Sequence, residues 1–175
     1  MYIQKHAFRR LDERLDSLPR STTHSYLYAS MLTPELHPIG ENRALIAYTI
    51  VNTKMGYLVA EYIDGAVLIH TFLFITNNGT PEGKKLYEFT GLGMLDKKYL
   101  ALDKMSSFIK SDIGKNEKLK TVFEKAGCGC LLNIDDFLQR ISTKQADNKN
   151  TDLILRYLKT DVAAYEEEEL VVGSD

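Results

Sequence analysis

Cysteine is scarce in this sequence, and the two cysteines, Cys128 and Cys130, are separated by a single residue. A disulfide framework needs pairs that are better spaced, so this scarcity predicts a reducing, cytoplasmic setting. Long hydrophobic runs are also missing, because no apolar stretch approaches the roughly 18 residues of a membrane span. The opening MYIQKHAFRR lacks the apolar core of a signal peptide. We therefore expect neither a disulfide scaffold nor contact with a membrane.

A strong charge of either sign is missing as well, because the formal net charge is −2. This balance argues against a basic protein that coats nucleic acid non-specifically. The charges are unevenly distributed: residues 141–175 contain 4 basic and 8 acidic side chains, whereas residues 1–140 contain 18 basic and 16 acidic ones. The acidity is therefore concentrated at the C-terminal end of the sequence.

What is present is an ordinary globular composition, 44% hydrophobic and 26% charged over 175 residues. A chain of this length fits one domain with room for an appended subdomain. The residue patterns predict a helix and an antiparallel sheet over residues 1–92, a helical subdomain over 93–165 and an acidic tail over 166–175. No pattern in the sequence indicates an oligomeric state.

The strongest local signal is Asp64-Gly65, which lies between two stretches rich in β-branched and aromatic residues. Such a dipeptide predicts a two-residue hairpin turn joining strands over 57–63 and 66–75. A turn of this length sets the register and places Glu61 opposite Leu68. One face of the hairpin is then nearly all apolar and consists of Leu58, Ala60, Tyr62, Val67, Ile69, Thr71, Leu73 and Ile75.

The other face of the predicted hairpin carries two groups capable of acid–base chemistry. The same register places Val59 opposite His70, so that Glu61 and His70 become diagonal neighbours within side-chain reach. An ordinary cross-strand pair on a solvated face is an equally good interpretation of these two residues.

Around the hairpin, periodicity predicts an α+β fold: a helix on an antiparallel sheet of three to five strands, followed by three or four helices. Outside the hairpin, the expected elements are helices over 3–18, 21–32, 96–111, 116–127, 134–141 and 152–165, and a strand over 44–51. The segment 84–90 is too short to assign as strand or helix. The preceding segment NNGTPEG, residues 77–83, is predicted to be a turn, because it lacks the spacing of a phosphate-binding loop.

The first predicted helix places three basic side chains, His6, Arg10 and Arg14, four residues apart along one edge. Arginines on a helix edge commonly remain solvated and pair with nearby carboxylates such as Glu13 or Asp16. Metal-independent RNA cleavage is the chemical alternative. It needs a base for the 2′-hydroxyl, an acid for the leaving oxygen and a cation for the charged phosphorane.

The helix motif H-A-x-R-R-x-x-x-R (residues 6–14), followed by a hairpin containing D-G-x-x-x-x-x-T-F-L (residues 64–73), resembles the small RelE/BrnT-type toxins and early-transcript endoribonucleases of phages. These belong to the barnase–EndoU–colicin–RelE group of folds. The resemblance covers about residues 3–92 and implies catalytic roles for His6 and Arg10 on the helix, and for His70 or Thr71 on the strand. Such toxins are usually basic and about half as long, and they have no counterpart of the later helices.

Two functions follow from these observations. The first is a metal-independent endoribonuclease without a cofactor. Its catalytic candidates are His6, Arg10, Glu61, His70 and Thr71, and its substrate-binding candidates are Arg9, Arg14, Tyr57, Lys84 and Lys85. The second is a non-catalytic phage-type protein that binds a protein partner through its C-terminal helices. The corresponding partners are RNA and another protein.

Overall fold

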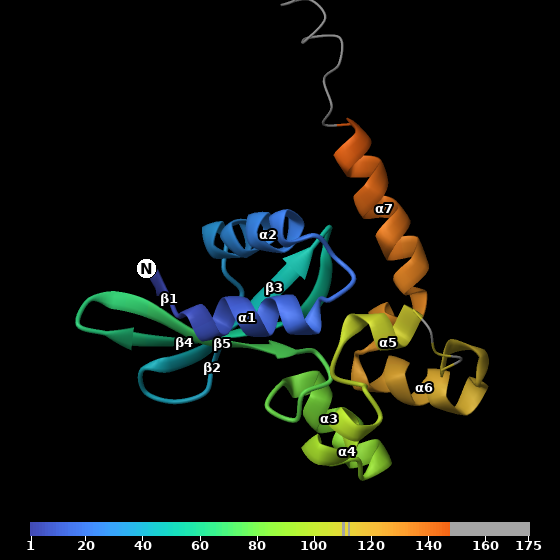
Figure 1. Cartoon of the computed structure of the whole chain (residues 1–175). Helices are drawn as coiled ribbons and strands as arrows, with labels where there is room; N and C mark the ends of the chain where they lie inside the picture. Colours follow the sequence, from blue (N-terminus) through green and yellow to red (C-terminus); the bar gives the residue numbers. More distant parts are fainter. Residues whose placement is uncertain (110, 112, 148–175) are drawn as a thin grey trace, which may run out of the picture. The chain divides into compact units, whose positions relative to one another are not determined.

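The Asp64-Gly65 hairpin forms the middle of a five-stranded sheet in the computed structural model, which describes residues 1–109, 111 and 113–147 (Figure 1). The fold is α+β, as the sequence predicted. Contacts divide the chain into two units, Met1–Phe137 and Leu138–Asp175. The first unit contains the sheet and every element up to the start of the last described helix. The predicted helix over 152–165 and the acidic tail lie outside the described residues.

The sheet has the strand order β1-β5-β4-β3-β2. Its strands are β1 (Tyr2–Ile3), β2 (Leu36–Pro38), β3 (Arg43–Ile50), β4 (Thr53–Ile63) and β5 (Ala66–Phe74). The strands β2 to β5 pair antiparallel, whereas the short β1 pairs parallel to β5. The predicted meander is therefore present, and the N-terminal residues extend it by one parallel edge strand.

The predicted turn is confirmed, because Asp64 and Gly65 both adopt positive φ angles, 48° and 78°. The predicted register also holds near the turn, where Glu61 pairs with Leu68. Beyond it, β5 contains a bulge. Ala60 pairs with Ile69, but Val59 pairs with Thr71, so His70 has no partner residue on β4. The predicted pairing of Val59 with His70 is wrong, because a bulge inserts one extra residue into the strand.

The bulge exchanges the two faces of β5 beyond His70. Thr71 and Leu73 pair with Val59 and Tyr57 and share their face, whereas Phe72 pairs with Leu58 on the opposite face. The predicted all-apolar face is therefore correct only up to Ile69. An alternation argument assumes a strict period of two, and one inserted residue reverses every later position.

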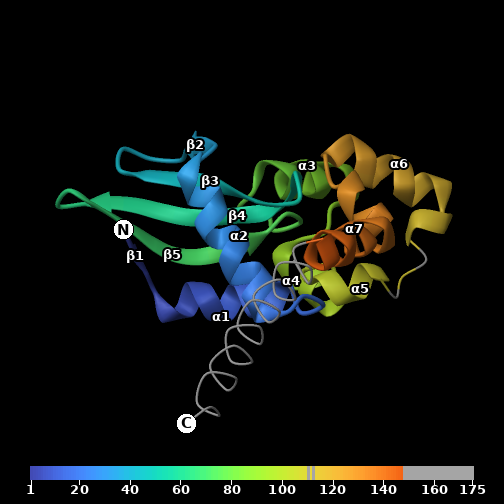
Figure 2. The same ribbon diagram turned by 90° about the horizontal axis from the view of Figure 1, so that it is seen from above.

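Helix α1 (Lys5–Arg14) runs along the β5 edge of the sheet, and helix α2 (Arg20–Leu32) crosses one of its faces (Figures 1 and 2). Helix α1 buries Ala7 and Leu11, and it begins later than predicted because Tyr2–Ile3 pair with β5 instead. Helix α2 lies against β3, where the hydroxyl of Tyr48 donates a hydrogen bond of 2.8 Å to the carbonyl of Thr23. These contacts make α1 the element that flanks β5 at the margin of the sheet.

The chain after β5 is helical throughout its described part. It contains α3 (Pro81–Thr90), α4 (Met94–Tyr99), α5 (Met105–Ile109), the 3-10 turns η1 (Ile113–Lys115) and η2 (Gly129–Asn133), α6 (Glu117–Ala126) and α7 (Ile134–Asp147). The segment 84–90 belongs to a helix rather than a strand. The segment 77–83 forms the loop before α3 together with the first turn of that helix.

The expected single helix over 96–111 is wrong, because a turn separates α4 from α5. Ala101 has a φ of 55° there, and the carbonyl of Leu102 accepts a hydrogen bond from the hydroxyl of Thr76 instead of continuing a helix. Helix α6 has the predicted ends: the side chain of Asn116 accepts from two amides at its start, and Gly127 ends it with a φ of 86°. The domain boundary at residue 92 stays a prediction, and α3 packs against α6 across it.

No helix of the described part of the chain is long and apolar enough to cross a membrane.

Candidate functional site

The bulge in β5 presents His70 to Glu61. The imidazole Nε2 of His70 lies 2.6 Å from Oε2 of Glu61, and both side chains are partly buried. Bulges of this kind redirect a side chain and occur next to active sites. The sequence predicted that these two residues would be within reach of each other, and the structure brings them into direct hydrogen-bonding contact.

A third residue, Arg43, completes this group from the neighbouring strand β3. Arg43 pairs with Glu61 in the sheet, and its Nε lies 3.3 Å from Oε1 of the carboxylate. The Nδ2 of Asn42 donates to the same oxygen at 3.3 Å. The Arg43 guanidinium, followed by the His70 imidazole, holds the pKa of Glu61 below its usual value. Glu61 is therefore an ionised acceptor that orients the His70 ring.

The other two predicted site residues on the sheet lie on the same face as this pair. Thr71 follows His70 and is opposite Val59. Tyr57 is buried further along β4, where its hydroxyl donates to Glu82 at 3.0 Å and accepts from Lys54 at 2.9 Å. The Tyr57 hydroxyl therefore links the sheet to α3 and does not contact Glu61 or His70.

The predicted residues of α1 lie along its exposed side. His6 Nδ1 contacts Arg9 at 3.1 Å, and both side chains line an open groove of about 810 Å³ between α1 and α2. Arg10 pairs with Glu13 at 2.9 Å, which is the solvated arrangement that was the alternative. Arg14 instead forms an ion pair with Asp103, far along the sequence.

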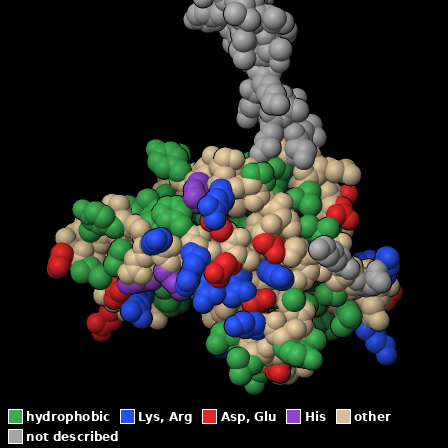
Figure 3. Space-filling model, in the orientation of Figure 1, with side chains coloured by type: hydrophobic (Ala, Val, Ile, Leu, Met, Phe, Trp, Pro, Cys, Tyr) green, Lys and Arg blue, Asp and Glu red, His purple; other side chains and the backbone are tan. Residues whose placement is uncertain are grey.

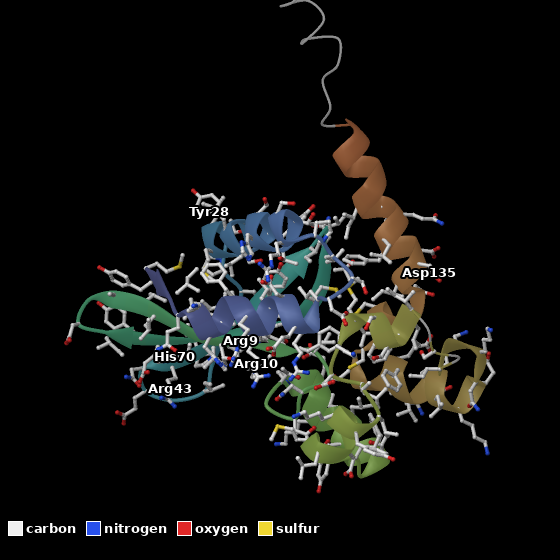
Figure 4. All side chains as sticks on the ribbon, viewed as in Figure 1. Arg9, Arg10, Tyr28, Arg43, His70 and Asp135 are labelled. Carbon is white, nitrogen blue, oxygen red and sulfur yellow. The ribbon has the colours of Figure 1, made fainter. Side chains whose placement is uncertain are left out.

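Lys, Arg and His side chains gather in a band across the face of the molecule shown in Figure 3. Figure 4 labels Arg9 and Arg10 on α1, with His70 and Arg43 on the sheet beside it. The amide of Gln4, at the end of β1, donates to the carbonyl of Ile69 at 3.0 Å. His6, the second residue of α1, therefore closely follows the point where the chain bonds to Ile69, the residue before His70.

A second concave region lies between α1, the β5–α3 loop and the segment of α4 (Met94–Tyr99). This pocket, called here the loop–α4 pocket, has a volume of about 240 Å³. It is lined by Arg10, Arg14, Thr76, Asn77, Asn78, Met94, Leu95, Lys97, Lys98 and Asp103. Two of the predicted residues, Arg10 and Arg14, thus meet in one pocket. Lys84 and Lys85 do not line it and are exposed on α3.

Sequence reasoning missed Arg43 and the loop–α4 pocket. The pairing of β3 with β4 is the signal that places Arg43 opposite Glu61. The pocket residues Asn78, Lys97 and Lys98 carried no comparable signal, because they come from a loop and a short helix. Among the described residues, no group of three or more His, Cys, Asp or Glu side chains is placed to share a metal ion.

The fold and its sites define an α+β protein with a His–Glu pair at a bulge and a basic pocket beside α1. Comparisons with models of protein families, with curated proteins and with solved structures found no match to this chain.

Proposed function

We propose that this protein is a metal-independent endoribonuclease in which Glu61 and His70 supply the acid–base chemistry. The observation that carries the proposal is the 2.6 Å contact between His70 Nε2 and the Glu61 carboxylate. A carboxylate on one ring nitrogen fixes the tautomer of the histidine and leaves the other nitrogen to exchange a proton with substrate. The resemblance of residues 3–92 to RelE-like ribonucleases supports the same assignment.

In this mechanism the Nδ1 of His70 accepts the proton of the 2′-hydroxyl, while Glu61 stabilises the imidazolium that forms. The 2′-oxygen attacks the phosphorus, and the bond to the 5′-oxygen breaks. His6, at the start of α1, donates the proton that the leaving 5′-oxygen takes up. The products are a 2′,3′-cyclic phosphate and a free 5′-hydroxyl, so protons and bonds balance without a cofactor.

The negative charge of the phosphorane requires a cation beside these groups. Arg10 lies one helical turn beyond His6 on the same edge of α1. Its ion pair with Glu13 is solvent-exposed and contributes little free energy, so the guanidinium is free to bind phosphate. The planar guanidinium binds two phosphate oxygens at once, which suits this role better than lysine does.

The test is incubation of the purified protein with cellular RNA at low salt, with and without EDTA. The expected result is a set of discrete fragments that end in cyclic phosphate, formed equally in both conditions. Loss of cleavage in EDTA would contradict the metal-independent mechanism. Absence of fragments from a correctly folded sample would contradict the ribonuclease assignment itself.

A second candidate function is binding of a protein partner through the later helices. The observation that favours it is the exposure of large apolar side chains on and next to α4, with Leu95 78% and Tyr99 90% exposed. Apolar side chains gathered on a surface mark interaction sites more often than single ones do. Recovery of a specific partner by the intact chain, and its loss in Leu95→Asp, would support this function. Binding that is unchanged by the substitution would contradict the use of this surface.

A further inference from the structure

The loop–α4 pocket shares Arg10 with the proposed nuclease site but contains neither Glu61 nor His70, and four of its lining side chains are cationic. These are Arg10, Arg14, Lys97 and Lys98, against a single carboxylate, Asp103. Asp103 is already engaged by Arg14 in an ion pair. Arg10 pairs with Glu13 outside the lining, so Lys97 and Lys98 are the pocket cations without an ion pair in the described part of the chain.

The two asparagines of the pocket each accept a hydrogen bond through the side-chain oxygen. Asn77 Oδ1 accepts the amide of Gly79 at 2.8 Å, and Asn78 Oδ1 accepts Lys97 Nζ at 2.5 Å. Within residues 1–109, 111 and 113–147, neither Nδ2 has a hydrogen-bond partner, so each is a donor with two available hydrogens. Donor groups together with cations are the complement of an oxyanion, which only accepts hydrogen bonds.

Lys97 connects α4 to the β5–α3 loop and the first turn of α3, and only 2% of its surface is exposed. Its ammonium donates to the carbonyls of Thr76 and Gly83, at 2.9 and 2.8 Å, as well as to Asn78. All three partners are neutral, and within the part of the chain that the structure describes no carboxylate forms an ion pair with this ammonium. Burial lowers the pKa of Lys97 below its usual value. A buried cation with neutral partners is stabilised further when an anion binds nearby.

The loop that carries the asparagines is preorganised by its own contacts. Thr80 caps α3 by accepting the amide of Gly83 at 3.0 Å, and its hydroxyl donates to the carbonyl of Ile75 at 2.7 Å. The backbone of Asn77 lies so close to Gly83 that a Cβ on this glycine would be 1.8 Å from the Asn77 oxygen. The donors are therefore in place before a ligand arrives, which lowers the entropy that binding must overcome.

We propose that the loop–α4 pocket binds a phosphate group. The volume of about 240 Å³ accommodates a phosphate with the sugar that carries it. Two sources share this chemistry: the terminal phosphate of a nucleotide or RNA end, and an internal phosphate of an RNA strand. Arg14, which lines the pocket, lies eight residues after His6 on α1. The two residues are therefore separated by about 12 Å along the helix axis. The proposal does not depend on cleavage by Glu61 and His70.

The test is a titration of the full chain with inorganic phosphate at low salt, followed by amide proton–nitrogen NMR. We expect saturable shifts at Asn77, Asn78 and Lys98. The decisive variant is Asn78→Asp, which keeps an oxygen for Lys97 but replaces the free donor with a second acceptor and a negative charge. Phosphate binding should weaken by about 10- to 100-fold, as expected when a charge-assisted hydrogen bond is lost, while the melting temperature does not fall.

A matched pair of variants tests the pocket independently of any effect of Asn78→Asp on folding. Lys98→Gln removes a cation that lines the pocket, whereas Lys118→Gln makes the same change on an exposed residue of α6. Binding should weaken several-fold in the first variant and stay unchanged in the second. Equal effects of the two variants, or shifts that do not saturate, would overturn the proposal.

Competition separates the two sources of phosphate. Displacement of inorganic phosphate by a nucleoside 5′-monophosphate, but not by a short RNA without terminal phosphates, would assign the site to a terminal phosphate. Displacement by that RNA would assign it to an internal phosphate. Failure of both to compete would overturn binding of a biological phosphate group. A chain that binds phosphate yet cleaves no RNA would keep this inference and exclude the proposed nuclease activity.

Discussion

The imidazole Nε2 of His70 lies 2.6 Å from Oε2 of Glu61, and a bulge in β5 makes this contact possible. The bulge leaves His70 without a partner residue on β4, so its ring is free to turn toward the carboxylate. Arg43 binds the same carboxylate through its other oxygen. The three side chains therefore form one polar group that spans β3, β4 and β5.

Replacement of the histidine tests its catalytic role directly. We expect His70→Ala to lower the rate of RNA cleavage by about 10²–10⁴, the usual contribution of a positioned acid or base. His24→Ala is the control, because this exposed histidine lies on α2, where it neighbours Asp12 and Phe8. The measurement is the initial rate of fragment formation. An equal loss of rate in the two variants would contradict a specific role for His70.

The lowered pKa of Glu61 makes a prediction about stability and pH. A carboxylate whose pKa is lower in the folded state stabilises the fold above its unfolded pKa, near 4.5, and this contribution is lost as the pH falls through the folded pKa. Glu61→Gln should therefore lower the melting temperature at neutral pH, and the difference from wild type should shrink as the pH falls below 4.5 and vanish once it is below the folded pKa.

Glu41→Gln is a suitable control for this measurement. Glu41 is exposed just before β3, and in the described part of the chain it forms no ion pair. Its substitution should leave the melting temperature nearly unchanged at both pH values. A Glu61→Gln difference that persists undiminished in acid would show that the ionised carboxylate is not the source of the effect.

Close packing at Gly83 predicts a strong effect on folding. A Cβ at this position would lie 1.8 Å from the Asn77 carbonyl oxygen, so Gly83→Ala must displace the loop before α3. We expect a loss of about 1–3 kcal/mol in the free energy of unfolding, as for other overpacking substitutions. Gly40→Ala, where the nearest atom would be 3.8 Å away, should be nearly neutral. Urea denaturation measures both, and similar values for the two would be inconsistent with this packing.

The buried hydroxyl of Tyr48 is expected to stabilise the contact of α2 with the sheet. Tyr48 is fully buried, and its hydroxyl donates to the Thr23 carbonyl at 2.8 Å. Burial raises the pKa of Tyr48, so this hydroxyl stays protonated. Tyr48→Phe removes the hydroxyl that donates to the buried carbonyl of Thr23. The free energy of unfolding should fall by about 1–3 kcal/mol. Tyr28→Phe, on the exposed side of α2, should leave the free energy of unfolding nearly unchanged (Figure 4). Thermal denaturation that shows no difference between them would contradict this role.

Features that depend on neighbouring residues could be predicted from the sequence. The Asp64-Gly65 turn, the Asn116 and Gly127 ends of α6 and the helix α2 all have the expected places. Each is determined by backbone preferences and hydrogen bonds within a few residues, so the sequence alone contains the necessary information. Proximity of Glu61 to His70 could be predicted for the same reason, because a tight turn joins their strands.

The remaining features required the tertiary structure, because they join residues that the sequence separates. The bulge at His70 lies in the pairing of β5 with β4, and it reversed the predicted face of Thr71. The break between α4 and α5 accompanies the hydrogen bond from Thr76 to Leu102, 26 residues apart. The loop–α4 pocket combines side chains of a helix near the N-terminus, a loop after β5 and α4. Local preferences determined which elements this sequence forms, and packing between distant elements decided which side chains meet, because burial and hydrogen bonding act on distance in space.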